Sequence, residues 1–370
     1  MKKILFVIGV KYGSAYYRME LPAKALKDKG YHVDIVTKIN PYQLQAIKDG
    51  VFGEQILNIM DYDVIVFQLV FKDWLFKLIK FLKAKGKTVV VDTDDDYFNL
   101  PADSPAFKEY HPKCITEKEN GITKRIWHKE SVNDSIKIFV EALRNASIVT
   151  VTTPQLAELY YPINRNIFVL ENCIDNEIYD GVRKPLNDGL VIGWQGSKTH
   201  LEDLRLVTGC IPENAWLVIV GYSEGFKLFK DQKNKIYLSS FEIIDIAKVL
   251  ANINIGMVPL VDNKFNSGKS DIKGLEYAAM GIPAVASKVA PYKRWIEHGV
   301  NGFFATKPIE WMRYFKLLME NQDLRQNMGA MAKKKALTRD IKNNIHKWVE
   351  VYDHSAIENI NHKNMAVVNA

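Results

Sequence analysis

A short run of charged and hydroxyl side chains late in the chain has the composition of a nucleotide site. Ser270 and Asp271 precede an amphipathic stretch, and Lys269 and Lys273 flank its start. A helix that begins there presents free N–H groups and the positive end of its dipole, which together can bind a diphosphate. Glu276 follows one turn after Lys273, where its carboxylate can accept hydrogen bonds from a ribose diol. The spacing predicts a nucleotide-binding helix; a solvated helix of mixed charge is the alternative.

A second loop has residues suited to a phosphate. Gly196, Ser197 and Lys198 follow an expected strand at 190–194 and precede a helical stretch. Glycine lets the backbone approach a ligand, and the hydroxyl and the ammonium can both donate to phosphate oxygens. His200 can cap that helix, and with no nucleophile nearby the sequence gives it no general-base role.

The first expected strand leads into a comparable loop. Gly13 and Ser14 allow close approach of a ligand at this strand-to-helix turn, and Arg18 adds a positive charge. The spacing is not that of a dinucleotide-binding fingerprint, and an ordinary connecting loop is the alternative. We expect these three residues to contact the bound nucleotide ligand.

An acidic run, Asp94, Asp95 and Asp96, closes the fourth expected strand. Adjacent carboxylates can supply a base, orient a hydroxyl or bind a divalent cation, and a solvated acidic turn is the alternative. We expect Asp94 and Asp95 to be catalytic. The segment 96–129 that begins there has no clean periodicity. It could form one side of the site that binds a second substrate.

The elements that must position these groups alternate between β-branched runs and amphipathic helical patterns, which is typical of parallel sheets flanked by helices. We expect an α/β protein of two doubly wound Rossmann-like domains facing across a cleft, with ligands at the carboxyl ends of the strands. The polar segment 175–189 is the expected linker. It gives domains at 1–180 and 181–340, followed by a helical stretch at 341–370. The expected strands lie at 4–9, 32–37, 64–68, 88–91, 148–152, 167–170, 190–194, 216–220, 253–259, 284–287 and 302–305, and the first-domain helices at 18–29, 74–85, 131–144 and 154–160.

Composition narrows the class of protein. The chain has 370 residues, 47% hydrophobic and 25% charged, which indicates a globular protein long enough for two domains. Its net charge of +7 favours an anionic partner, whether nucleotide, nucleic acid or acidic membrane surface. The three cysteines, Cys114, Cys173 and Cys210, lack the spacing of a zinc site or a disulfide set. We expect reduced thiols and a cytoplasmic protein, with peripheral contact to a membrane as an option.

With these residues in place, the chain resembles the retaining glycosyltransferases of family 4 and their relatives with the GT-B fold. The segment 172–175, Asn-Cys-Ile-Asp, is similar to that family's Asn-Gly-x-Asp segment, and 269–283 is similar to its donor-binding helix. The resemblance implies that Glu276 holds the donor ribose, that Lys198 and Lys273 neutralise the diphosphate, and that no metal is needed. It also implies that the last helix crosses back to the first domain.

The resemblance implies a nucleoside diphosphate sugar, with a UDP-sugar favoured, as co-substrate and no further cofactor. The acceptor is left open among a polysaccharide, a lipid-linked molecule, a protein and modified DNA. Gly268 stands where the family often has a second Glu that contacts the sugar, so that role is unassigned, with Lys269 and Asp271 as the nearest polar residues. Two alternatives remain: a DNA-modifying glycosyltransferase or nucleic-acid-directed binder, and a nucleotide-sugar epimerase of the same fold.

Overall fold

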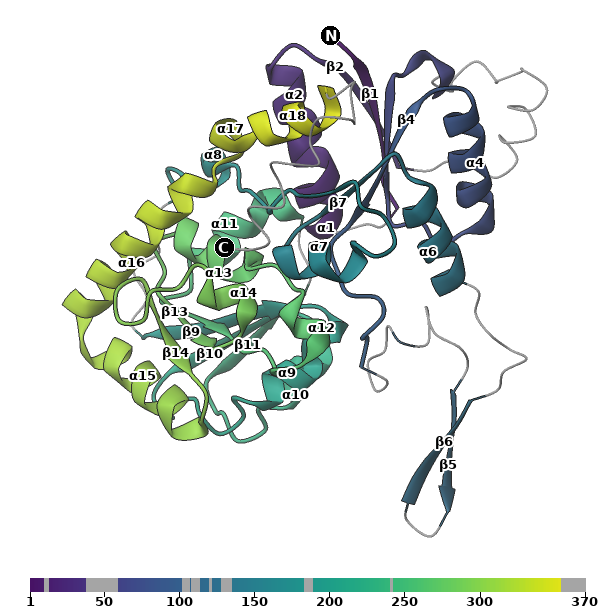
Figure 1. Ribbon diagram of the computed structural model, residues 1–370. Coiled ribbons are helices and arrows are strands. Elements are labelled where there is room, and N and C mark those ends of the chain that lie inside the picture. Colours follow the sequence, from purple (N-terminus) through teal and green to yellow (C-terminus); the bar gives the residue numbers. More distant parts are fainter. Residues whose placement is uncertain are drawn as a thin grey trace. The chain divides into compact units, whose positions relative to one another are not determined.

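The computed structural model describes residues 1–9, 13–37, 59–101, 107, 135–182, 189–239 and 242–353, together with the backbone of 114–119 and 122–127. This part of the chain forms two units, each built on its own parallel sheet (Figure 1). Unit 1 comprises the described residues of Met1–Tyr97, Lys108–Glu171 and Ile341–Ala370, and unit 2 those of Phe98–Phe107 and Asn172–Asp340. The expected pair of doubly wound Rossmann-like domains is therefore confirmed.

Unit 1 has six parallel strands in the order β2-β1-β3-β4-β7-β8. Its central strands β3 and β4 are buried along nearly their whole length, because helices cover both faces of a parallel sheet. Strand order reverses between β1 and β3, which marks the edge where ligands of such sheets bind. The strands are β1 (Lys3–Val7), β2 (His32–Val36), β3 (Val64–Gln68), β4 (Thr88–Thr93), β7 (Ile148–Val151) and β8 (Ile167–Val169). The helices are α1 (Gly13–Ala15), a π-helical turn (Tyr16–Glu20), α2 (Leu21–Asp28), a 3-10 turn (Ile59–Asp61), α4 (Asp73–Ala84), α6 (Ser135–Asn145) and α7 (Pro154–Tyr160).

The chain returns to unit 1 at its C-terminal end through α17 (Ile341–Asn344) and α18 (His346–Asp353). The ring of Tyr352 meets Phe6 of β1 edge to face, with centroids 6.1 Å apart, and Lys2 Nζ donates to the Tyr352 carbonyl at 3.0 Å. Figure 1 shows α17, in yellow, beside α2, which it contacts. The expected crossing of the last helix to the first domain is confirmed for residues 341–353, and the rest of that stretch, 354–370, lies outside the described residues.

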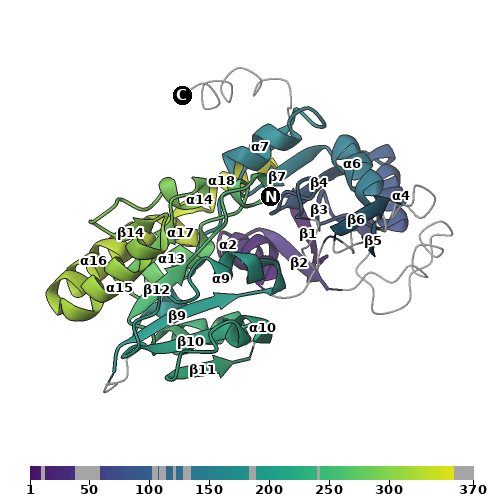
Figure 2. The ribbon, with the colours of Figure 1, turned by 90° about the horizontal axis from the view of Figure 1, so that it is seen from below.

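Unit 2 has six parallel strands in the order β11-β10-β9-β12-β13-β14, so its order reverses between β9 and β12. Figure 2 shows β9, β10 and β11 side by side with α10 next to them. The strands are β9 (Val191–Gly196), β10 (Trp216–Gly221), β11 (Lys235–Leu238), β12 (Ile255–Val258), β13 (Ala284–Ser287) and β14 (Gly302–Ala305). The helices are α8 (Asn176–Tyr179), α9 (Leu201–Arg205), α10 (Ser223–Lys227), α11 (Ile246–Leu250), α12 (Lys264–Ser267), α13 (Ile272–Ala279), α14 (Ala290–Lys293), α15 (Pro308–Glu320) and α16 (Gln322–Ala336), with 3-10 turns at Lys198–His200, Ile243–Asp245 and Leu337–Arg339.

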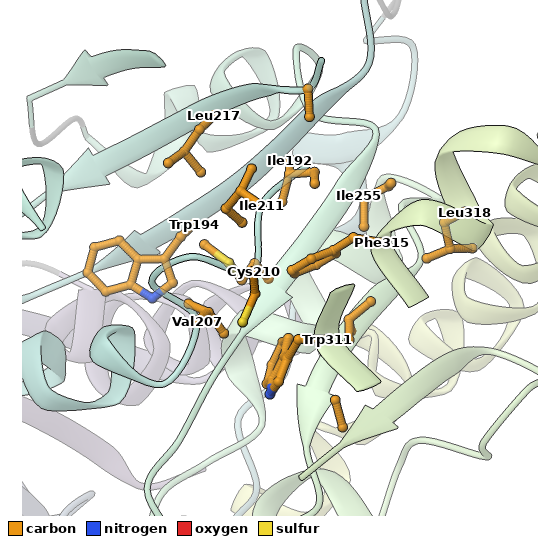
Figure 3. Packing of buried hydrophobic residues seen from close by; sticks show 14 of the residues in the cluster. Ile192, Trp194, Val207, Cys210, Ile211, Leu217, Ile255, Trp311, Phe315 and Leu318 are labelled. Atoms are coloured by element: carbon orange, nitrogen blue, oxygen red, sulfur yellow. The ribbon is translucent and has the colours of Figure 1, made fainter. Parts of the chain in front are cut away.

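The core of unit 2 fixes the strand that leads into the candidate site. Trp194 of β9 is 1% exposed, and it belongs to one buried cluster with Ile192 and Ile255 from the sheet. Trp311 and Phe315 of α15 add two aromatic rings to this cluster, as Figure 3 shows. Such burial stabilises each large side chain by about 1.5–3 kcal/mol. The end of β9 is therefore held by packing against this cluster.

Two features differ from the sequence expectations. Strand β11 was not expected, and part of the segment 96–129, expected to be irregular, forms an antiparallel pair of strands, β5 (Cys114–Glu119) and β6 (Ile122–Trp127). Among the residues that the structure describes, no helix combines the length and the apolar character needed to cross a membrane.

Candidate active site

The two loops that the sequence singled out in the second half of the chain meet at the point where strand order reverses in unit 2. Glu276 lies in the second turn of α13, one turn after Lys273, and is 4% exposed. The side-chain amide of Gln195, in β9, donates a hydrogen bond to the Glu276 carboxylate. This contact joins the start of α13 to the carboxyl end of β9, the edge at which doubly wound sheets bind nucleotides.

An aromatic ring holds Lys273 at this edge. The Lys273 ammonium lies 5.4 Å from the ring centroid of Trp194, a cation–π contact that orients the side chain. A Cβ at Gly196 would come within 2.3 Å of the same ring, so a residue with a side chain there would displace Trp194. Gly196 therefore serves the packing of the strand end as well as the approach of a ligand.

Positive charge converges on one place in the site. His200 is buried, and burial together with the charges of Lys273 and Lys269 lowers its pKa to about 3. Its Nδ1 lies 2.8 Å from Asp203 Oδ2, and Asp203 Oδ1 accepts a hydrogen bond from the amide of Asn266 at 2.7 Å. His200 is therefore neutral at physiological pH, and the two lysines add positive charge to its surroundings.

The residues that precede α13 are engaged by neighbours within unit 2. Ser270 Oγ accepts a hydrogen bond from the Asn172 amide at 3.1 Å. The Asp271 carboxylate pairs with Arg339, at 3.2 Å from Nη1 to Oδ2. Asp271 thus serves as a partner of Arg339, whereas the sequence suggested that it contacts the donor.

The loop after β9 presents its polar groups at the surface. Ser197 is exposed, and its Oγ lies 3.0 Å from Thr199 Oγ1. Lys198 is half-buried and opens the 3-10 turn that leads into α9. These side chains border the edge of the sheet that carries Gln195.

In unit 1, the loop with Gly13 and Ser14 lies at the corresponding reversal of strand order. The Gln68 side chain at the end of β3 connects it to β1: it accepts from the Gly9 N–H at 3.3 Å, and its amide donates to Ser14 Oγ at 3.3 Å. A Cβ at Gly9 would lie 1.9 Å from the Gln68 carbonyl oxygen, so β1 can end this close to β3 only at a glycine.

Arg18 is buried in the interior of unit 1. Its guanidinium is completely buried and pairs with Asp92 of β4, at 2.6 Å from Nη2 to Oδ2 and 3.0 Å from Nε to Oδ1. It also donates to the carbonyl of Leu170, and Thr150 donates to Asp92 at 2.7 Å. The pKa of Arg18 stays raised because the attraction of Asp92 outweighs the cost of burial. This side chain has no surface to offer a donor, and we leave it out of the proposed binding site.

The backbone of the acidic run after β4 is held by hydrogen bonds to the buried Tyr160. Asp94 and Asp95 are half-buried and Asp96 is buried. The Tyr160 hydroxyl donates to the Asp95 carbonyl at 2.8 Å and accepts from the Tyr97 N–H at 3.1 Å, which fixes the backbone of the run. Burial raises the pKa of Tyr160 well above its usual value, so it remains a donor. Within the described ranges, no group of three or more histidine, cysteine or acidic side chains is placed to hold a metal ion.

Gln195, Asp203, Asn172 and Arg339 were not among the expected site residues. Each has a polar side chain that is buried or nearly so and hydrogen-bonded to a residue far away in the sequence. The spacing of neighbouring residues in the sequence does not reveal contacts of this kind. For Asn172 alone the sequence held a hint, because this residue begins the Asn-Cys-Ile-Asp segment that is similar to a segment of the glycosyltransferase family.

Comparison with known proteins agrees with this geometry. Residues 191–321 match the family described as glycosyl transferases group 1, and these residues include β9, α13 and the loops between them. No curated protein matched the sequence.

Solved structures share the fold over nearly the whole chain. Sucrose-phosphate synthase from Thermosynechococcus elongatus is 12% identical with a TM-score of 0.66, covering 95% of this chain and 98% of that one. HepE from Anabaena, in complex with UDP and glucose, is 14% identical with a TM-score of 0.65, covering 96% and 100%. An alpha-glucosyltransferase in complex with UDP is 11% identical with a TM-score of 0.66, covering 95% and 100%.

The fold is therefore GT-B, the class of two Rossmann-like domains that these structures share. The match of residues 191–321 to a glycosyl transferases group 1 domain agrees with the glycosyltransferase resemblance of the sequence.

Proposed function

We propose that this enzyme transfers a sugar from a nucleoside diphosphate sugar, with a UDP-sugar favoured, to an acceptor hydroxyl. The observation that carries the proposal is the meeting of Lys273 and Glu276 of α13 with Gln195 of β9 at the strand reversal of unit 2. The presence of UDP in the structures of HepE and the alpha-glucosyltransferase supports the choice of base.

Each group has a chemical role in this proposal. Glu276 accepts hydrogen bonds from the ribose hydroxyls. Lys198, Lys273 and the helix start after Ser270 receive the diphosphate and stabilise the charge that grows on it as the glycosidic bond breaks, which is where electrostatic catalysis contributes most. Lys269, whose ammonium lies 4.3 Å from the Phe265 ring centroid, adds a third cation to the same place.

Reaction without a metal ion follows from this distribution of charge, and it is part of the proposal. A diphosphate carries two negative charges. The lysines and the helix dipole together supply positive charge of similar size. Retention at the anomeric carbon is proposed on the family resemblance.

A cytoplasmic location is supported by the free thiols of Cys173 and Cys210, which are typical of a reducing compartment.

The first unit is proposed to serve the transferred sugar and the acceptor. Asp94 and Asp95 stand at the carboxyl end of β4, and Gly13 and Ser14 lie at the reversal of strand order beside β1 and β3. The carboxylates can orient an acceptor hydroxyl or accept its proton.

A panel of nucleoside diphosphates and their sugars tests this function. A ligand that binds only the folded protein raises the melting temperature of the protein. We expect UDP and at least one UDP-sugar to raise it. Absence of a shift with every member would contradict the proposal. Incubation with the stabilising donor alone separates the epimerase alternative, because only an epimerase forms an isomeric nucleotide sugar without an acceptor. Steeply salt-dependent binding to duplex DNA would instead indicate a nucleic-acid partner.

A further inference from the structure

Arg339 joins two of the places where the chain passes from one unit to the other, at 171–172 and at 340–341. It lies next to the last residue of unit 2, and its Nε donates at 3.0 Å to the carbonyl of Asn172, the first residue after the crossing from unit 1. The Arg339 carbonyl accepts from the Ile174 N–H at 3.0 Å, and the next residue, Asp340, accepts from the Asn176 side chain at 2.5 Å. The two crossing segments are thus bonded to each other within unit 2.

The same guanidinium holds the residue that precedes α13. Its Nη1 and Nη2 lie 3.2 and 3.4 Å from the two carboxylate oxygens of Asp271. The side chains of Arg339 and Asp271 are 15% and 6% exposed, so solvent screens this pair only in part. Asn172, which Arg339 also contacts, donates to Ser270 Oγ.

The Asp271 side chain pairs with Arg339 and does not cap its helix. Asp175 caps α8, accepting from Glu177 N at 3.1 Å, and Asn263 caps α12, accepting from Asn266 N at 2.8 Å; both have the extended backbone typical of a capping residue. Asp271 is the N-cap of α13, but its backbone, with φ −86° and ψ 9°, is not extended, and its side chain makes no hydrogen bond to that helix.

We infer that Arg339 is a positioning residue of the donor site: it holds the Asp271 carboxylate and balances its charge, so that the first-turn N–H groups of α13 receive the donor diphosphate. The inference rests on the proposed function. The physical reason is charge, because a carboxylate without a cationic partner at this end of the helix offsets the attraction of the helix dipole for a phosphate. Without Arg339, the unbalanced charge of Asp271 beside the start of α13 would repel the diphosphate.

The test compares two ligands and two variants by calorimetry. We expect R339Q to bind UDP about tenfold more weakly than the parent, a change that one freed charge close to an anion can produce. Uridine, which has no phosphate, should bind both proteins alike. Removing the freed carboxylate in the double variant R339Q/D271A should restore most of the lost UDP affinity.

A matched control comes from the end of α16. Lys333 pairs with Asp180 at 3.3 Å, so K333Q removes a positive charge from the same part of unit 2 without touching Asp271, and we expect UDP to bind it as it binds the parent. If R339Q does not fold, R339M and R339M/D271A give the same comparison, because methionine removes the charge and keeps an unbranched side chain that can pack in place of the arginine stem.

The outcomes separate the inference from the proposed function. If the parent binds no nucleoside diphosphate, both are wrong. If the parent binds UDP and R339Q binds it equally well, or if R339Q/D271A stays as weak as R339Q, Arg339 has only a structural role and the inference alone is wrong. Equal weakening of UDP and uridine in R339Q would also overturn it.

Discussion

Gln195 and Glu276 are joined by a hydrogen bond from the amide of one to the carboxylate of the other, and both side chains are buried. A buried carboxylate without a hydrogen-bond donor is costly, so the amide of Gln195 offsets part of the cost of burying Glu276. It also fixes how the carboxylate is turned relative to β9. A ligand hydroxyl would therefore meet an acceptor already in position, the arrangement that gives binding sites their precision.

Glu276→Gln should weaken UDP binding while the fold is kept. The amide has the same shape but loses the charge-assisted hydrogen bond to the ribose, worth about 1.5–3 kcal/mol. Calorimetric titration with UDP and with uridine measures the loss, which should be equal for both because both carry the ribose. Glu224→Gln on the surface of α10, where Glu224 pairs with Lys227, is the control. Unchanged affinity for uridine would remove Glu276 from the ribose site.

Lys273→Ala should affect the phosphate end of the donor. Its charge is needed most as the diphosphate leaves, so sugar transfer should fall by about a hundredfold, whereas uridine binding should stay close to that of the parent. The comparison is made between kcat and the uridine dissociation constant. Lys248→Ala, which breaks the exposed pair with Asp245 in the same unit, should have no effect on either. Transfer at the parental rate would make Lys273 a structural partner of Trp194 only.

Asp95→Ala should lower sugar transfer and leave UDP affinity intact, because the proposed donor site belongs to the other unit. Asp73→Ala, at the exposed start of α4, is the matched control. The same assay with a chelator addresses the metal. Activity that survives chelation supports direct action of the carboxylates, whereas activity that is lost and then restored by magnesium or manganese contradicts a metal-free mechanism.

His200 should make the protein less stable as the pH falls from about 6.5 towards 3. Its pKa is about 3 in the folded state, lowered by burial and by the charges of Lys273 and Lys269, against an ordinary value of 6.5. Between these values the unfolded chain binds a proton that the folded chain does not, so stability is complete above pH 6.5 and is lost by up to about 1.4 kcal/mol per pH unit below it. Urea unfolding of His200→Asn, whose amide can still donate to Asp203, should show a flatter dependence; parallel curves would count against this account.

Much of the fold follows from local patterns in the sequence. The strands β3, β13 and β14 have the expected bounds, because buried β-branched runs between turn residues predict parallel strands well. Strand β11 was missed since it is short and Ile236 in its centre is 44% exposed, which leaves a weak apolar signal. The β5–β6 pair had a signal that was passed over, the Asn-Gly dipeptide at 120–121 between two alternating segments.

The site was predictable as far as its spacing is local. Ser270 lies just before α13, and Lys273 and Glu276 lie in its first two turns, so the sequence alone brings them together. Gln195 meets Glu276 across 81 residues, and Arg339 meets Asp271 across 68. Those contacts depend on which strands neighbour each other, and that order cannot be read from the spacing of residues.

Hydrogen–deuterium exchange of the parent protein with and without UDP tests the central claim most directly. The account places the nucleotide on unit 2, so UDP should slow exchange in the peptides that contain 195–200 and 269–276. Slowed exchange there, abolished for the second peptide by Glu276→Gln at the same UDP concentration, is the predicted result. UDP that binds without slowing exchange in either peptide would contradict a donor site at the start of α13.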